Sequence, residues 1–236
     1  MIPKNNYEHI FFDFDHTLWD FDRCSNEVIE EFYDEYGLEK YDDISLEQFY
    51  ESFKKINFHF WDLYNHDKIT KEQIRDERFP TVFKELKIPF SENIKNIGDE
   101  YLQRCPMKPY AIPHAHDILD QLGKDYQLHL ITNGFKDVLK IKMKYGKFEN
   151  YFKTITTSEC SGYKKPSPEI FDHALDISGA QKENSIMIGD NVDTDINGAR
   201  NAGIDCIFFN PMNIESTVPV NFEIHSLNEL VEIFYQ

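Results

Sequence analysis

The chain has 236 residues, enough for one large domain or for a core domain that carries an insertion. Its formal net charge of −17 disfavours nucleic acid polymers and membrane surfaces as partners, because both attract cationic side chains. A hydrophobic fraction of 41%, with 20 phenylalanines and 13 tyrosines, supplies material for a globular core.

The first predicted element is a buried strand over residues 9–14, with the sequence HIFFDF. The N-terminal residues before it lack the apolar stretch of a signal peptide, and no apolar run in the chain approaches the roughly 18 residues of a membrane helix. The four cysteines are far apart and form no CxxC pair, which favours reduced thiols over a disulfide framework or a zinc site. We therefore expect a cytoplasmic protein.

A long, charged segment with helical periodicity follows, and it contains no clear strand. It predicts four or more amphipathic helices, over residues 25–37, 45–65, 70–86 and 91–105. We expect residues 21–109 to form a helical domain inserted between residues 1–20 and 110–236. The aromatic residues Phe58, Phe60, Trp61 and Tyr64 favour packing inside this helical domain, and a platform for base stacking is the alternative.

After the insertion, short apolar runs alternate with helical patterns. Strands are predicted over residues 128–132, 154–158, 185–190 and 205–210, and helices over residues 116–123, 167–179 and 193–203. Ser167 is the expected N-cap of the helix at 167–179. Strands that alternate with helices predict an α/β fold with a Rossmann-like parallel sheet covered by helices on both faces.

Polar side chains follow several of these strands, and ligands of open α/β sheets bind beyond the carboxyl ends of the strands. The first strand leads into Asp13, Asp15 and Thr17, the second into Thr132 and Asn133, and the fourth into Asp190, with Asp193 and Asp195 soon after. Lys164 and Lys165 lie between the third strand and the next helix. The sequence thus predicts carboxylates, hydroxyls and an ammonium at one edge of the sheet.

Asp13 and Asp15 are two residues apart, so on a strand they would share a face and resist joint ionisation. A divalent cation would resolve this repulsion, and Asp190 would add an oxygen ligand. Ligation by oxygen alone suits Mg²⁺, whose open coordination positions suit a phosphoryl group. One aspartate could then attack phosphorus while the other manages the proton, with Thr17, Thr132 and Asn133 near the phosphoryl oxygens.

Four segments, DFDHTL, ITNG, GYKKPSPEIF and GDNVDTDINGARNAG, resemble in order and spacing the motifs of the haloacid dehalogenase superfamily, specifically its Mg²⁺-dependent phosphatases. The resemblance implies that Asp13 is a nucleophile that forms an aspartyl-phosphate and that Asp15 is the general acid/base. It further implies that Thr132 and Lys165 bind the phosphoryl group. Asp13, Asp15, Asp190 and Asp195 would form the metal site, Asp15 through its backbone carbonyl. The helical insertion would be a cap that closes over the substrate.

The segments FDFDHTLWDFD, FWDLYNHDKIT and LITNGF, together with KKPSPEIFDHAL, are similar to bacterial 5′-nucleotidases that act on non-standard pyrimidine nucleotides. The N-acylneuraminate-9-phosphatases share much the same motifs. His114 stands where a glycine is common in the family. The resemblance implies a small phosphorylated substrate, with pyrimidine nucleoside 5′-monophosphates, non-standard ones included, as the preferred class.

Three alternatives stay open. The chain could be a sugar-phosphate phosphatase or a phosphomutase on the same fold. A dehalogenase on this fold is disfavoured, because dehalogenation does not need Asp15. A non-enzymatic alternative is a phospho-accepting signalling or binding module, although receiver domains are about half this length. A monomer and a homodimer are both compatible with the sequence.

Overall fold

The structure is a computed structural model that describes residues 7–41, 44–90, 94–216, 218–220 and 222–235. Its internal contacts divide the chain into two compact units. One unit comprises Met1–Phe21 with Pro109–Gln236, and the other comprises Asp22–Lys108. The second unit is a continuous segment of the chain that separates the two parts of the first in the sequence.

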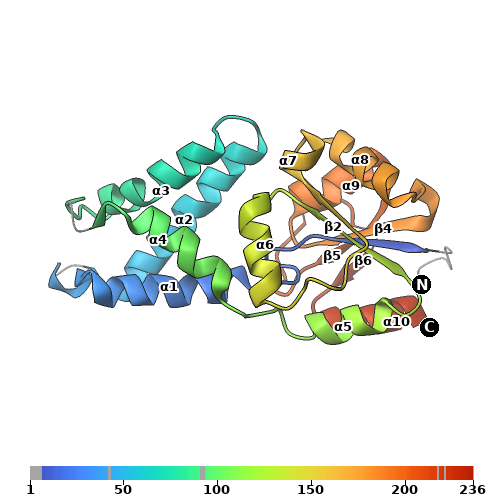
Figure 1. The fold of residues 1–236 in the computed structure, drawn as a ribbon, viewed down its shortest axis with the longest axis horizontal. Coiled ribbons are helices and arrows are strands. Elements are labelled where there is room, and N and C mark those ends of the chain that lie inside the picture. Colours follow the sequence, from blue (N-terminus) through green and yellow to red (C-terminus); the bar gives the residue numbers. More distant parts are fainter. Residues whose placement is uncertain (1–6, 42–43, 91–93, 217, 221, 236) are drawn as a thin grey trace. The chain divides into compact units, whose positions relative to one another are not determined.

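The first unit is built on a six-stranded sheet in which all neighbouring strands are parallel (Figure 1). The strands are β1 (His9–Phe12), β2 (Gln127–Thr132), β3 (Thr154–Thr157), β4 (Ser185–Gly189), β5 (Asp205–Phe209) and β6 (Phe222–Ile224), in the order β3-β2-β1-β4-β5-β6. The predicted parallel α/β fold is confirmed. The short strand β6 was not predicted, because three residues are too few for a recognisable pattern.

Helices cover both faces of this sheet, with α8 and α9 on one face and α5 and α10 on the other (Figure 1). The helices of the unit are α5 (Ala115–Leu122), α6 (Lys136–Tyr145), α7 (Ser158–Ser161), α8 (Pro168–Ser178), α9 (Gly198–Ala202) and α10 (Leu230–Tyr235). A π-helical turn, Val192–Asn197, precedes α9 where one continuous helix was predicted. Ser167 occupies the predicted N-cap of α8, but its side chain makes no capping hydrogen bond.

An apolar core joins the sheet to α8 and α9. Phe11 and Met187 from the central strands belong to one buried cluster with Phe171 of α8 and Ala199 of α9, and all four side chains are at most 1% exposed. Full burial of a large apolar side chain contributes about 1.5–3 kcal/mol to folding. This core holds β1 and β4 side by side, and the loops that follow these two strands are therefore held close together.

His114, the N-cap of α5, has a left-handed backbone with a φ of 69°. Side chains with a Cβ rarely adopt this conformation, and glycine adopts it without strain. The geometry explains why glycine suits this position. The His114 side chain is exposed, so the packing of the core does not require a histidine at this position.

The second unit consists mainly of α1 (Phe21–Glu35), α2 (Leu46–Asn65), α3 (Lys71–Glu85) and α4 (Ile97–Arg104). Ser45 and Thr70 begin α2 and α3 with capping boxes, in which each hydroxyl accepts from the backbone N–H three residues later. The helices agree with the predicted pattern, and residues 91–93 of the predicted helix at 91–105 lie outside the described residues.

The predicted aromatic cluster of α2 is divided between core and surface. Phe60 and Tyr64 are buried in the core of the unit, whereas Phe58 is 69% exposed and Trp61 is half-buried. The packing interpretation is therefore confirmed only for Phe60 and Tyr64.

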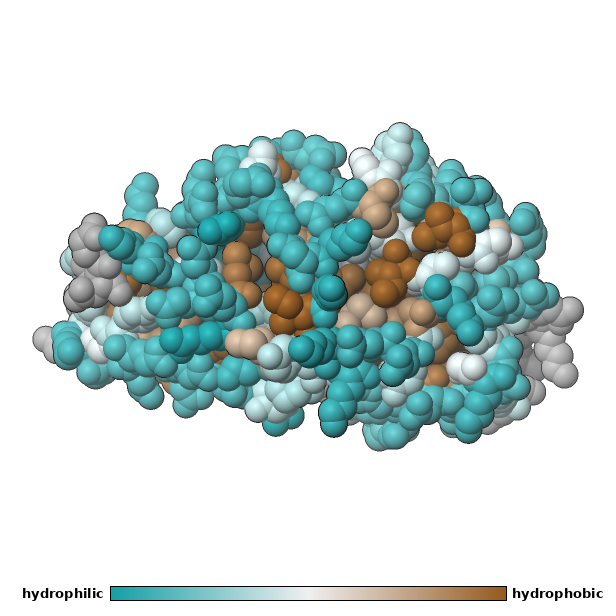
Figure 2. Space-filling model, in the orientation of Figure 1, coloured by the Kyte–Doolittle hydropathy of each residue, from teal (hydrophilic) through white to brown (hydrophobic). Residues whose placement is uncertain are grey.

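Hydrophilic residues predominate on the face shown in Figure 2, in keeping with the high content of charged residues. All four cysteines are free thiols, and only Cys160 is exposed. None of the helices in the described part of the chain has the length and apolar character needed to cross a membrane.

Candidate active site

The candidate site lies where the strand order reverses, between β1 and β4. Phe12 at the end of β1 pairs with Ile188 of β4, so the two strands end at nearly the same level. The backbone N–H of Asp13 continues this pairing and donates to the carbonyl oxygen of Ile188 at 2.9 Å. Such a switch point, beyond the carboxyl ends of parallel strands, is where open α/β sheets bind their ligands.

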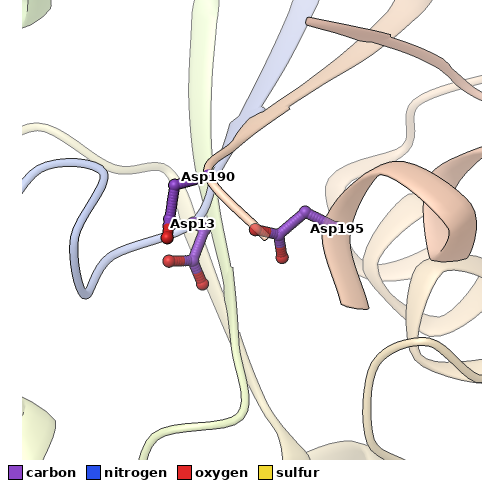
Figure 3. A group of neighbouring side chains, drawn as sticks. All are labelled: Asp13, Asp190 and Asp195. Carbon is purple, nitrogen blue, oxygen red and sulfur yellow. The ribbon is translucent and has the colours of Figure 1, made fainter. Parts of the chain in front are cut away.

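Three aspartates converge at this point. Asp13 follows β1, Asp190 follows β4, and Asp195 lies in the π-helical turn (Figure 3). One carboxylate oxygen from each residue lies within 4.8 Å of the others. Asp13 is 7% exposed and Asp195 only 1%, so water screens their repulsion poorly.

Burial and mutual repulsion raise the pKa of two of these acids. For Asp13, burial is the main cause of a strongly raised pKa, Asp195 and Asp190 raise it further, and Lys165 opposes them. Burial, followed by the nearby charge of Asp195, raises the pKa of Asp190 to about 7. The cluster therefore needs positive charge beside it to keep Asp13 and Asp190 ionised at neutral pH.

Lys165 supplies part of this charge. Its Nζ donates to Asp13 Oδ1 at 2.5 Å, to Asp195 Oδ1 at 2.6 Å and to the carbonyl oxygen of Ile131 at 3.0 Å. These contacts use all three N–H donors of the ammonium group. Although burial lowers the pKa of Lys165, the carboxylates of Asp13 and Asp195 raise it above its ordinary value, so the side chain stays charged.

Asn133 holds Lys165 in place through its side-chain amide. Its Nδ2 donates to the Lys165 carbonyl oxygen and its Oδ1 accepts from the Lys165 N–H, both at 2.8 Å. This pair of hydrogen bonds joins the loop after β2 to the loop before α8. The side chain that we predicted to contact phosphate thus has a backbone partner in the described structure.

Asp195 is fixed in the same way. Its Oδ2 accepts from the backbone N–H of Asn191 at 3.0 Å while its Oδ1 faces Lys165. A Cβ at Gly189 would lie only 2.3 Å from Asp195 Oδ2, so the carboxylate reaches this place because residue 189 has no side chain. Asp193, the other acid of this turn, is exposed.

The two threonines also lie at the site. Thr17 is fully buried, and its hydroxyl donates to Asp190 Oδ1 at 2.8 Å, so it orients that carboxylate. Thr132 ends β2 and is 2% exposed, and its Oγ1 accepts from the N–H of Gly134 at 2.9 Å. The described structure therefore brings the predicted segments together at one edge of the sheet.

The prediction that Asp13 and Asp15 share a strand face is wrong, because β1 ends at Phe12 and both residues lie in the following loop. Asp15 Oδ1 instead accepts from Lys142 Nζ of α6 at 2.6 Å. Lys142 was not predicted from the sequence. A signal was present, since Leu139, Lys142 and Met143 recur at helical spacing and are the buried residues of α6.

The donor set of the aspartate cluster fits Mg²⁺. Asp13, Asp190 and Asp195 offer only carboxylate oxygens, the ligand type that Mg²⁺ prefers. Three carboxylates beside the single ammonium of Lys165 leave two negative charges when all are ionised, which a divalent cation would balance. Among them, Asp195 has donors at both oxygens, so Asp13 and Asp190 are the more available ligands.

The chain is similar to known proteins over most of its length. The chain is 27% identical over 230 residues to the pyrimidine 5′-nucleotidase PynA of Streptococcus pneumoniae, covering 96% of this chain and 94% of that protein. It is 28% identical over 202 residues to mouse N-acylneuraminate-9-phosphatase, covering 83% and 79%. The crystal structure of the HAD-hydrolase YfnB from Bacillus subtilis, bound to magnesium, has the same fold, with a TM-score of 0.86, 24% identity and coverage of 98% and 100%. The profile of the haloacid dehalogenase-like hydrolases matches residues 10–209, and the chain belongs to this family.

Proposed function

We propose that this protein is a Mg²⁺-dependent phosphomonoesterase that acts on small phosphorylated metabolites through an aspartyl-phosphate. The observation that carries the proposal is the buried contact of Lys165 with Asp13 and Asp195 beside Asp190. A buried carboxylate held by an ammonium at the ligand-binding edge of the sheet suits a nucleophile that must approach an anionic phosphate.

In the first step, a carboxylate oxygen of Asp13 bonds to phosphorus and the bond to the leaving oxygen breaks. Asp15 gives a proton to that oxygen, so the product departs as a neutral alcohol. In the second step, water attacks the phosphorus of the aspartyl-phosphate and Asp15 takes up the proton. Inorganic phosphate leaves and Asp13 is regenerated, while Thr132 contacts the phosphoryl oxygens.

The other side chains of the site support both steps. Lys165 holds Asp13 in place and offsets its charge, and Thr17 orients Asp190. Asp13 and Asp190 would hold Mg²⁺, which when bound neutralises phosphoryl oxygens and the surrounding carboxylates. Because Asp195 has donors at both oxygens, we assign it to the positioning of Lys165.

The preferred substrates in this proposal are nucleoside 5′-monophosphates, with pyrimidine nucleotides first. Full-length similarity to a pyrimidine 5′-nucleotidase supports this class. Similarity to an N-acylneuraminate-9-phosphatase over 83% of the chain supports a second candidate, the phosphate ester of an acylated sugar acid. A lid function for the helical unit, a cytoplasmic location and the oligomeric state stay predictions.

The test is phosphate release from nucleoside 5′-monophosphates, sugar phosphates and p-nitrophenyl phosphate, with Mg²⁺ and with EDTA. Asp13→Asn should lower turnover by a factor on the order of 10³ or more, because it removes the attacking oxygen's charge. Asp193→Asn, a change at an exposed acid in the turn beside the site, is the matched control and should stay within about twofold of the wild type.

Circular dichroism would show that both variants are folded. Near-normal activity of Asp13→Asn would refute the assigned nucleophile. A long-lived acylphosphate without release of phosphate would identify a phospho-accepting protein instead, and conversion of β-glucose 1-phosphate in a coupled assay would identify a mutase. A marked preference for pyrimidine nucleotides would support the narrower substrate class.

A further inference from the structure

Lys142 is buried although the lysines around it on α6 are not. Lys142 is only 7% exposed, whereas Lys140 and Lys144 are exposed. The Nζ of Lys142 donates to Asp15 Oδ1 at 2.6 Å. Burying an ammonium group is costly unless a partner compensates its charge, so the burial of Lys142 indicates a role other than solubility.

Two aromatic rings complete the surroundings of this ammonium group. Its Nζ lies 4.2 Å from the ring centroid of Trp19 and 5.7 Å from that of Phe21. Trp19 is fully buried, so its ring is a fixed surface that limits where the Lys142 side chain can lie. The cation–π contact and the carboxylate together hold Nζ in one position, and Asp15 Oδ1 is held with it.

The other oxygen of Asp15 lies near the loop that follows β2. A Cβ built at Gly134 would be 3.6 Å from Asp15 Oδ2 and 3.1 Å from Thr132 Oγ1, which places both oxygens on the same side of this loop. Lys142 thus binds one carboxylate oxygen and leaves the second facing the segment proposed to contact the phosphoryl group. The second oxygen is therefore the one available for proton transfer, which requires that it come within hydrogen-bond reach of the leaving oxygen.

The site therefore contains two buried ammonium groups that serve different acids. Lys165 contacts Asp13 and Asp195, and Lys142 contacts Asp15. We propose that Lys142 is a positioning residue that fixes the carboxyl group of Asp15 for proton transfer to the leaving oxygen. This inference rests on the proposed phosphomonoesterase function, and it adds a residue that the four sequence motifs do not contain.

The test uses two substrates that differ in their need for a proton. A nucleoside 5′-alkoxide leaves poorly without protonation, whereas p-nitrophenolate is a stable anion and leaves without help. Because kcat/KM reports the steps up to departure of the leaving group, loss of Asp15 positioning should lower it mainly for the nucleotide. We expect Lys142→Met to lower kcat/KM about 10- to 100-fold for uridine 5′-monophosphate and less than about fivefold for p-nitrophenyl phosphate.

The ratio of the two kcat/KM values is the decisive quantity. Both come from one enzyme preparation, so the ratio does not depend on the fraction of the variant that is folded. Lys142→Arg, which keeps a cationic donor, should restore at least half of the loss on a logarithmic scale. Lys140→Met removes an exposed lysine of the same helix and should leave the ratio unchanged. The loss should appear in kcat, with KM changed less than about threefold.

The outcomes distinguish a failure of this inference from a failure of the proposed function. If wild-type enzyme hydrolyses both substrates and Lys142→Met leaves their ratio unchanged, the positioning role is refuted and the phosphatase function stands. An equal loss on both substrates without rescue by Lys142→Arg would also refute it, because that pattern indicates a structural role. If wild-type enzyme releases phosphate neither from these two substrates nor from the other nucleotides and sugar phosphates of the activity test, the proposed function and this inference both fail.

Discussion

His129 of β2 makes stability sensitive to acid, and the size of this effect follows from its surroundings. The side chain is fully buried, with Nε2 3.0 Å from His9 Nδ1 and Nδ1 2.8 Å from Thr154 Oγ1. Its ring also stacks on Phe11 with centroids 4.7 Å apart. Burial, and secondly the positive charge of a protonated His9, lower the pKa of His129 to about 4.

A histidine in an unfolded chain has a pKa of about 6.5. Between pH 6.5 and 4, residue 129 therefore binds a proton in the unfolded chain but not in the folded protein, and the free energy of unfolding falls as the pH falls. The contribution is fully present above pH 6.5. One pKa unit corresponds to about 1.4 kcal/mol, so His129 accounts for a loss of about 2 kcal/mol at pH 5 and about 3.4 kcal/mol below pH 4.

Urea denaturation at pH 7.5, 6.0 and 5.0 measures this effect. Between pH 7.5 and 5.0, the free energy of unfolding of the wild type should fall about 2 kcal/mol further than that of His129→Gln, which cannot take up the proton. His59→Gln changes an exposed histidine and should follow the wild type. Parallel pH profiles for the wild type and His129→Gln would refute the reasoning.

Two further changes test the charge balance and the backbone. Lys165→Met should lower the free energy of unfolding by about 3–5 kcal/mol, measured with urea at neutral pH, because it leaves Asp13 and Asp195 buried without their ammonium partner. Lys140→Met is the surface control. A loss below about 1 kcal/mol in Lys165→Met would contradict the assigned ion pairs. His114→Gly should raise the free energy of unfolding by about 0.5–1 kcal/mol by relieving the positive φ, and a decrease in the same assay would show that the histidine side chain contributes stability.

Both the α/β fold and most members of the site could be predicted because their signals are local. Apolar runs that alternate with helical patterns identify β1 to β5, and the polar residues that end those runs include Asp13, Thr132 and Asp190. The carboxyl ends of parallel strands share one edge of a sheet, so such residues must meet wherever the sheet forms. Strand β6 was not predicted, because a run of three residues is too short to show the alternation of a strand.

The sequence by itself determined that carboxylates, hydroxyls and a lysine gather at one edge of a parallel sheet, because strand periodicity and chain order suffice for that conclusion. Only the tertiary structure decided which acid each ammonium serves. Lys165 lies 152 positions from Asp13 and Lys142 lies 127 positions from Asp15, and local pattern carries no information about such distant partners. Their pairing depends on how α6 and the loop before α8 pack around the ends of β1 and β4, where burial makes each unpaired charge too costly to leave alone.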